Sequence, residues 1–232
     1  MRVLVTRSPD AAARTARKLA VRGHEACLAP VTRIVPTGAP VPDGPYIALI
    51  VTSARSVEAL ARLPDRQRAV FAVGERTADA VRAAGFSHVA VADGDAAALS
   101  RLIRASIPPG LTLLHVTARH RKEEPAASLH AAGFVVIQWE AYEAQALDTL
   151  PVAAAEALRT GQIAAALHYS RRSADLVVRL AEAAGLAANL RAISHLCLSA
   201  DVAAPLTAAG AAALVAEDPS EDALLKLLDP PP

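Results

Sequence analysis

Short apolar runs rich in β-branched residues alternate with longer, alanine-rich segments of helical periodicity along the chain. The apolar runs have the length of buried strands, and several of the helical segments begin at Ser, Thr or Asp and end at Gly. Such alternation indicates parallel sheets covered by helices on both faces, so we predict an α/β fold. Ten strands are predicted, at residues 2–6, 24–30, 47–52, 70–73, 88–92, 111–117, 134–139, 163–168, 193–198 and 213–216.

The chain also contains an internal repeat. Residues 53–56 resemble residues 170–173, and the match continues downstream to Gly85 and Gly210. A weaker match relates the N-terminal strand, helix and strand to residues 111–142. We use A for the N-terminal segment, B for the segment that begins near residue 53, A′ for residues 111–142, and B′ for the segment that begins near residue 170. This order allows two arrangements. The domains can be tandem, AB and A′B′, or B with A′ can form a domain inserted between A and B′, which then close together as the other domain.

The linkers favour the insertion. The clearest break in the pattern is a Pro- and Gly-rich stretch between A and B, where tandem domains need no boundary, whereas B and A′ are joined by a short turn. Two domains and two linkers are predicted, with domain 1 at 1–35 plus 147–232, domain 2 at 46–140, and linkers at 36–45 and 141–146.

Composition supports a globular protein without a nucleic-acid partner. Hydrophobic residues make up 53% and charged residues 20% of 232 residues, which is typical of a folded core. The formal net charge of +1 and the 3% of aromatic residues disfavour phosphate-backbone binding and base stacking.

Cys27 and Cys197 stand alone, which favours a reducing compartment, and no apolar run is long enough for an export signal or a membrane span. We therefore expect a cytoplasmic protein that has no membrane partner. We also expect a monomer.

Hydroxyl and basic side chains gather in the loops that follow the predicted strands. In open parallel sheets, ligands bind beyond the carboxyl ends of the strands, where helix N-termini present N–H groups. Two domains with such loops would suit a ligand that bears several carboxylates or phosphates. Each loop also fits a second interpretation, because Ser and Thr after a strand are ordinary helix N-caps and the arginines can be solvated surface charges.

Several familiar chemistries have no support in the sequence. There is no Gly-rich phosphate loop, no histidine or cysteine spacing typical of zinc sites, and no nucleophile elbow. We therefore expect neither a cofactor nor a metal. His115, His168 and His195 fall within or at the ends of predicted strands, where a hydrogen-bonded structural role is expected.

Tyr142 follows the last strand of domain 2, in the return linker. Its phenol could donate a proton or a hydrogen bond in an inter-domain site, or it could anchor the hinge by packing. The sequence leaves both roles open.

Four features follow one another along the chain in a defined order and spacing: VLVTR at 3–7, VTSARS at 51–56, AVGERTA at 72–78, and Tyr142 in its hinge. In these features, and over nearly its whole length, the sequence resembles the uroporphyrinogen-III synthase family. The resemblance implies two flavodoxin-like α/β domains joined by a two-stranded connector, the first domain being discontinuous. It also implies cofactor-free cyclisation of hydroxymethylbilane, with inversion of ring D and loss of water, to give uroporphyrinogen III.

The resemblance assigns Tyr142 a role in helping the substrate hydroxyl leave. Together with position after a strand, it makes six residues substrate-facing candidates: Arg7, Ser53, Thr77, Lys122, Ser170 and Ser199. The chain departs from the family where a Gly-x-x-Thr turn is usual, since residues 197–202 read CLSADV, and there Ser199 would supply the hydroxyl. The alternatives are a binding protein that closes on an anionic small molecule without chemistry, and a regulatory domain.

Overall fold

The computed structural model describes residues 1–229, which form two compact units. Unit 1 comprises Met1–Arg33 with the segment that begins at Gln145, and unit 2 is Ile34–Ala144. The units therefore join at Arg33/Ile34 and Ala144/Gln145, and the Pro- and Gly-rich stretch at 36–45 belongs to unit 2. The predicted division into two domains and two linkers stays a prediction, and residues 230–232 of predicted domain 1 lie outside the described residues.

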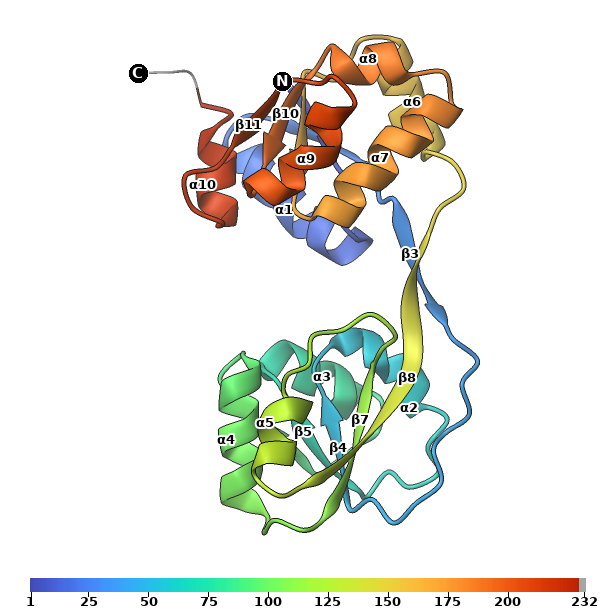
Figure 1. Ribbon diagram of the computed structural model, residues 1–232, viewed down its shortest axis with the longest axis vertical. Coiled ribbons are helices and arrows are strands. Elements are labelled where there is room, and N and C mark those ends of the chain that lie inside the picture. Colours follow the sequence, from blue (N-terminus) through green and yellow to red (C-terminus); the bar gives the residue numbers. More distant parts are fainter. Residues whose placement is uncertain (230–232) are drawn as a thin grey trace. The chain divides into compact units, whose positions relative to one another are not determined.

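Unit 1 is built on a five-stranded parallel sheet in the order β11-β10-β9-β1-β2. Its first, third and fourth strands along the chain are central, which is the flavodoxin order 2-1-3-4-5. The strands are β1 (Arg2–Val5), β2 (Glu25–Leu28), β9 (Ala165–His168), β10 (Ser194–Cys197) and β11 (Ala213–Val215) (Figure 1).

Unit 2 is built on a six-stranded sheet in the order β3-β8-β7-β4-β5-β6, parallel from β8 to β6. Its edge strand β3 lies beside β8, and the bonds from Thr37 N to Ala141 O and from Leu147 N to Val31 O fit an antiparallel pair. The chain passes between the units once in each of these two strands. The strands are β3 (Thr32–Pro36), β4 (Ala48–Val51), β5 (Ala69–Ala72), β6 (Val89–Val91), β7 (Thr112–Ala118) and β8 (Val135–Ala146).

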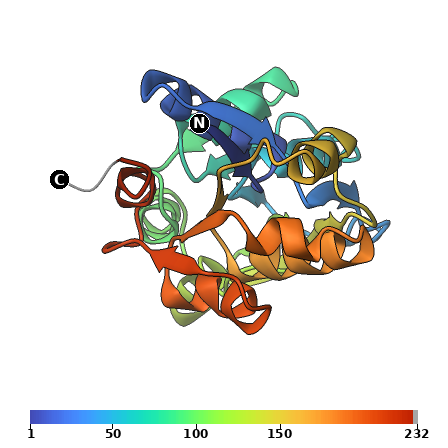
Figure 2. The same cartoon turned by 90° about the horizontal axis from the view of Figure 1, so that it is seen from above.

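Helices cover both faces of each sheet. In unit 1, α6, α7 and α9 pack on one face and α1 and α10 on the other, and α7 and α9 lie side by side (Figure 2). In unit 2, α2 and α3 pack on one face and α4 and α5 on the other. The helices are α1 (Pro9–Val21), α2 (Val57–Leu60), α3 (Glu75–Ala83), α4 (Ala96–Ser106), α5 (Ala126–Ala131), α6 (Val152–Arg159), α7 (Arg171–Ala183), α8 (Ala187–Arg191), α9 (Ala200–Ala208) and α10 (Glu221–Lys226), with a 3-10 turn η1 (Ala54–Ser56) before α2.

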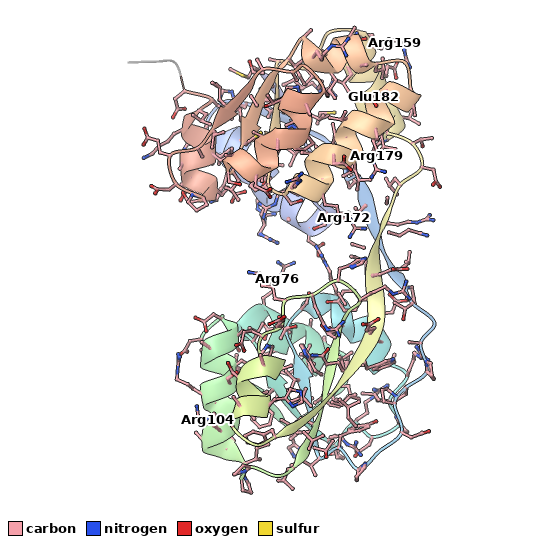
Figure 3. The ribbon with its side chains drawn as sticks, in the orientation of Figure 1. Arg76, Arg104, Arg159, Arg172, Arg179 and Glu182 are labelled. Atoms are coloured by element: carbon pink, nitrogen blue, oxygen red, sulfur yellow. The ribbon has the colours of Figure 1, made fainter. Side chains whose placement is uncertain are left out.

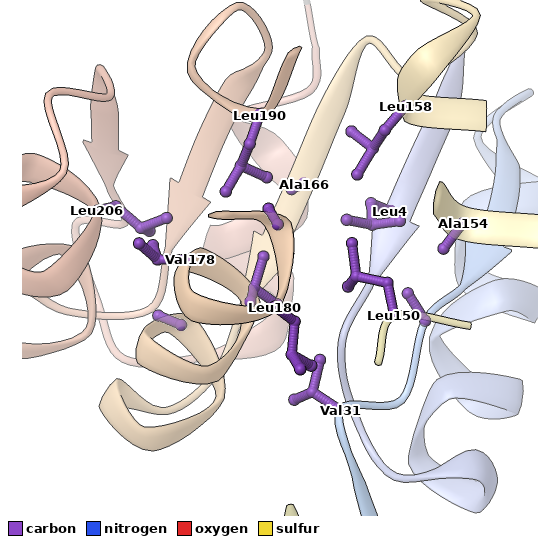
Figure 4. Close-up of a cluster of buried hydrophobic side chains, with 14 of the residues drawn as sticks. Leu4, Val31, Leu150, Ala154, Leu158, Ala166, Val178, Leu180, Leu190 and Leu206 are labelled. Carbon is purple, nitrogen blue, oxygen red and sulfur yellow. The ribbon is translucent and has the colours of Figure 1, made fainter. Parts of the chain in front are cut away.

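Strand alternation divides the core of unit 1 into two layers. Leu4 of β1 points to the layer that Figure 4 shows, together with Leu158 of α6 and Leu180 of α7. Its neighbours Val3 and Val5 point to the opposite layer. Because successive strand residues face opposite sides and both sides are covered, the central strands read as continuous apolar runs.

The two units repeat one topology. In each unit, three strands of a B repeat lie in reverse chain order beside the two strands of an A repeat. In unit 1 these are β11, β10 and β9 of B′, followed by β1 and β2 of A. In unit 2 they are β6, β5 and β4 of B, followed by β7 and β8 of A′. The flavodoxin-like arrangement thus occurs in both units, with the chain order permuted in unit 2. Gly85 and Gly210 each follow a helix with φ of 91° and 79°, a region that favours glycine. The internal repeat predicted from the sequence is confirmed.

All ten predicted strands are present and begin within a few residues of their predicted starts, but two features were missed. Strand β3 was not predicted: its residues fell at the end of predicted domain 1 and at the first position of the linker, and they are only partly buried and end at Pro36. Proline is tolerated at a sheet edge, where β3 lies. Strand β8 was predicted to end at Trp139, yet it continues to Ala146.

Candidate active site

Ser53, Thr77 and Tyr142 belong to unit 2, at or near the carboxyl edge of its sheet. Ser53 follows β4, Thr77 lies in the first turn of α3 after β5, and Tyr142 of β8 pairs with Ala118 at the end of β7. The η1 turn contacts both α3 and β7. Parallel strands end at the same edge, so the fold groups these three candidates within one unit.

Tyr142 lines a cavity of about 150 Å³. Its side chain is buried, and within residues 1–229 its hydroxyl has no hydrogen-bond partner. Arg55, Glu58 and Arg62 line the same cavity, since positions three and seven residues apart share one side of η1 and α2. Ile34, Pro36, Ala59 and Ala141 complete an apolar wall. The cavity therefore combines a phenol, two cations and a carboxylate with apolar surface.

Lys122 is exposed and lines a larger, open pocket of about 510 Å³. Arg119 and Arg121 line it too, but their charges are compensated. Arg119 Nη1 lies 2.8 Å from Glu143 Oε2, and Arg121 Nη1 lies 2.7 Å from Glu140 Oε1. In the part of the chain that the structure describes, Lys122 forms no ion pair. It is the cation of this pocket that is best placed to meet an added anion.

Ser170 and Ser199 are helix N-caps in unit 1. Ser170 Oγ accepts a hydrogen bond from Ser173 N at 3.2 Å, and Ser199 Oγ accepts one from Val202 N at 3.4 Å. Ser53 caps η1 in the same way, from Arg55 N. Capping of the helix is thus part of what each serine does, as the second interpretation of the sequence expected.

Arg7 follows β1 at the carboxyl edge of the unit 1 sheet and is half-buried in a polar cluster. Its Nη1 lies 2.7 Å from Glu221 Oε1 and donates to Thr15 Oγ1 at 3.1 Å. Its guanidinium carbon lies 4.0 Å from the centre of the Tyr169 ring, a cation–π contact. Lys18 Nζ contacts the other Glu221 oxygen at 3.0 Å.

This cluster holds Glu221 ionised and Tyr169 neutral. Burial alone would raise the pKa of Glu221, but hydrogen bonds from Thr15, Lys18 and Tyr169 and the charge of Arg7 lower it to about 2. Burial raises the pKa of the Tyr169 phenol well above its usual range, so it acts as a hydrogen-bond donor. The cluster carries a fixed negative charge between two cations.

The three strand histidines are buried, and each is hydrogen-bonded. His168 Nε2 lies 3.0 Å from His195 Nδ1, His195 Nε2 lies 2.8 Å from the Leu190 carbonyl, and His115 Nε2 lies 3.2 Å from Thr52 Oγ1. Burial and the charge of Arg121 lower the pKa of His115 to about 4. The hydrogen bonding predicted for these histidines is confirmed, and their structural role stays a prediction.

Sequence reasoning missed part of the Arg7 cluster and part of the lining of the Tyr142 cavity. Glu221 and Tyr169 were not singled out, because their contacts with Arg7 cross most of the sequence, and the i, i+3, i+7 spacing of Arg55, Glu58 and Arg62 was the only signal for the Tyr142 cavity. Figure 3 shows two further arginines at helix starts, Arg76 in α3 and Arg172 in α7.

In residues 1–229, no group of three or more His, Cys, Asp or Glu side chains is arranged to hold a metal ion. None of the helices described is long and apolar enough to span a membrane.

The model of the family described as uroporphyrinogen-III synthase HemD matches residues 13–226, nearly the whole chain. The chain belongs to the uroporphyrinogen-III synthase family. Uroporphyrinogen-III synthases are hydro-lyases of tetrapyrrole synthesis, so the resemblance seen in the sequence and the enzyme class it implies are confirmed. A comparison with curated protein sequences gives no match.

One solved structure supports the fold, and a second is similar in sequence. The structure of uroporphyrinogen-III synthetase from Helicobacter pylori 26695 is 17% identical, with a TM-score of 0.63, and covers 98% of both chains. A uroporphyrinogen III synthase from the extremely thermophilic bacterium Thermus thermophilus is 20% identical, with a TM-score of 0.43, and covers 98% of this chain and 95% of that one. At this identity the first similarity supports the fold.

Proposed function

We propose that this chain cyclises hydroxymethylbilane to uroporphyrinogen III, with inversion of ring D. The bond between the terminal methylene carbon and its hydroxyl breaks, and the hydroxyl leaves with one proton as water. The azafulvene that remains is attacked by the substituted carbon of ring D to give a spiro intermediate, which rearranges to the inverted macrocycle. No electrons are gained or lost, so the reaction needs no redox cofactor. The family match over residues 13–226 is the observation that carries this proposal.

Pre-organisation is the main contribution that the protein has to make. The substrate is a flexible chain of four pyrroles with eight carboxylates, and its ends must meet in one of two orientations. Holding the two ends in a reactive geometry lowers the entropic part of the activation barrier. Groups that bind the carboxylates are suited to hold the ends in this way. Arg7, Ser53, Thr77, Lys122, Ser170 and Ser199 are proposed to bind the substrate, through side chains or through the other N-terminal amides of the helices that the serines cap.

Tyr142 is proposed to donate a proton or a hydrogen bond to the departing hydroxyl. A cavity with apolar walls beside Arg55 and Arg62 suits a pyrrole ring that carries carboxylate arms. The hydroxyl of Tyr142 has no partner among residues 1–229, so its proton is available to a ligand. General acids typically contribute about 10²–10⁴-fold to a rate.

The proposal includes a monomeric, cytoplasmic enzyme without a nucleic-acid partner. The net charge of +1 supports the lack of a nucleic-acid partner, and two isolated, buried thiols support the cytoplasmic location. Sedimentation of the purified protein, with and without added nucleic acid, tests the monomeric state and the lack of a nucleic-acid partner. We expect the mass of a single chain and no change when nucleic acid is added.

The test of function is to supply the purified protein with freshly generated hydroxymethylbilane, oxidise the products, and separate the type I and type III uroporphyrin isomers. Without an enzyme the linear compound closes to type I, so predominance of type III is the expected result. Type I alone, from protein shown to be folded by circular dichroism, would refute the proposal and favour a binding protein.

A further inference from the structure

The Arg7 cluster lies where open α/β sheets bind ligands. In unit 1, β1 and β9 are adjacent, and the helices that follow them, α1 and α7, cover opposite faces of the sheet. This change of face marks a topological switch point, and in such sheets ligands bind there, beyond the carboxyl ends of the two strands. Arg7 follows β1 and Tyr169 follows β9, so the two stacked side chains come from the two strands that define that point.

Glu221 joins this pair from a distant part of the chain. It is the first residue of α10, and its Oε1 lies 2.7 Å from Arg7 Nη1, 2.7 Å from Thr15 Oγ1 and 3.0 Å from Tyr169 OH. Its Oε2 lies 3.0 Å from Lys18 Nζ. One carboxylate thus fixes a guanidinium, a buried hydroxyl and a phenol at the switch point.

The arrangement leaves part of Arg7 unused. Among residues 1–229, the hydrogen bonds of its guanidinium involve only Nη1, which contacts Glu221 and Thr15. The Nη2 and Nε donors are therefore available to another acceptor. A guanidinium whose plane is held by a ring and an ion pair loses little side-chain entropy when it binds a second carboxylate with those donors.

Glu221 itself is held rigidly. Leu224 and Leu225, one turn further along α10, are fully buried against Val3, Val5 and Leu19 in the core of unit 1. The Ser220 side chain caps the helix by accepting from Ala223 N at 3.1 Å. The position of the Glu221 carboxylate is thus set by the core rather than by the ligand.

We propose that Glu221 is a positioning residue, which orients Arg7 so that its remaining donors bind a carboxylate of the substrate. The proposal rests on the proposed function, in which Arg7 faces the substrate. It makes the C-terminal helix part of the binding machinery without contact between that helix and the substrate.

The test is steady-state kinetics of type III formation from hydroxymethylbilane by the full chain and by five variants. We expect Glu221→Ala to raise KM about tenfold with kcat within about twofold, because binding is weakened and the chemical step is untouched. Arg7→Ala should raise KM at least as much. Glu221→Gln keeps an acceptor at the same place and should recover part of the loss.

The double variant Arg7→Ala/Glu221→Ala separates positioning from a merely structural effect. If Glu221 acts through Arg7, the second substitution adds nothing to the first, whereas independent effects add. Asp222→Ala is the matched control, because Asp222 lies next to Glu221 in α10 but does not contact Arg7. Its Oδ1 lies 2.9 Å from Lys18 Nζ of α1.

Three outcomes overturn the proposal: an unchanged or lowered KM for Glu221→Ala, additive losses in the double variant, or an equal rise in KM for Asp222→Ala. A lowered KM would mean that Glu221 competes with the substrate for Arg7. If Glu221→Ala does not fold, Glu221→Gln against the wild type decides by the same criteria. Failure of the wild type to form type III is a separate result, which concerns the proposed function.

Discussion

His168 and His195 are joined by a hydrogen bond of 3.0 Å in the core of unit 1, and both side chains are fully buried. His195 Nε2 lies 2.8 Å from the Leu190 carbonyl, which can only accept, so this nitrogen carries the proton. The neutral His195 ring then accepts at Nδ1, and His168 donates from Nε2. His168 Nδ1 is left as a buried acceptor without a partner among residues 1–229.

The pair predicts a loss of stability in weak acid. Burial, with the charge of His195, lowers the pKa of His168 to about 3, and burial lowers that of His195. The folded protein therefore keeps both rings neutral, whereas the unfolded chain binds protons below about pH 6.5. The contribution of His168 to stability should be fully present above about pH 6.5 and be lost between about pH 6.5 and 3, by up to about 1 kcal/mol per pH unit, and His195 should add a loss of the same sign.

Urea unfolding of the wild type and of His168→Gln between pH 7.5 and 4.5 measures this dependence. The variant is expected to be less stable at every pH but to lose stability with a slope smaller by about 1 kcal/mol per pH unit. His120→Gln, which removes an exposed ring, is the control and should keep the wild-type slope. Equal slopes for all three proteins would contradict the assignment.

Removal of the Tyr142 hydroxyl tests its role in catalysis. We expect Tyr142→Phe to lower kcat for type III formation about a hundredfold with little change in stability, because the ring still fills the same place. Tyr46→Phe is a matched control, since Tyr46 is also a buried tyrosine of unit 2 and lies outside the Tyr142 cavity. Unchanged turnover of Tyr142→Phe would leave Tyr142 with a packing role only.

Two variants distinguish capping from substrate binding at Ser170. Ser170→Ala should lower the free energy of unfolding by about 1 kcal/mol, because the amide of Ser173 loses its acceptor. Asn is also a good N-cap, so Ser170→Asn should keep the stability of the wild type. If the serine hydroxyl also binds substrate, KM rises in both variants. A normal KM in Ser170→Asn would limit Ser170 to capping.

The fold could be predicted from the sequence because it depends on local patterns. The strands buried on both faces, such as β4, read as continuous apolar runs, and the repeat is visible in short motifs around Ser53 and Ser170. Strand β3 could not be predicted in this way, because it is an edge strand with partly exposed residues and so lacks a strong pattern.

Candidate site residues could be predicted where they follow the end of a strand or match a motif of the family that the sequence resembles. Arg7 and Ser199 were found by position after a strand, and Tyr142 by the resemblance. Glu221 was not, since a carboxylate near the start of a helix is ordinary in sequence and acquires its meaning from Arg7, far away along the chain. Contacts between residues so far apart depend on the packing of α10 on α1, which no local pattern encodes.

Lys122 provides a test of electrostatic binding in unit 2. We expect Lys122→Ala to raise KM for hydroxymethylbilane several-fold at low salt, because an exposed cation without an ion-pair partner among residues 1–229 is lost from an open pocket. The difference from the wild type should shrink as ionic strength rises, since salt screens exposed charges over about 8–10 Å. Lys226→Ala removes the same charge from the exposed side of α10 and should leave KM within about twofold. Equal effects of the two variants would mean that overall charge, rather than the pocket, attracts the substrate.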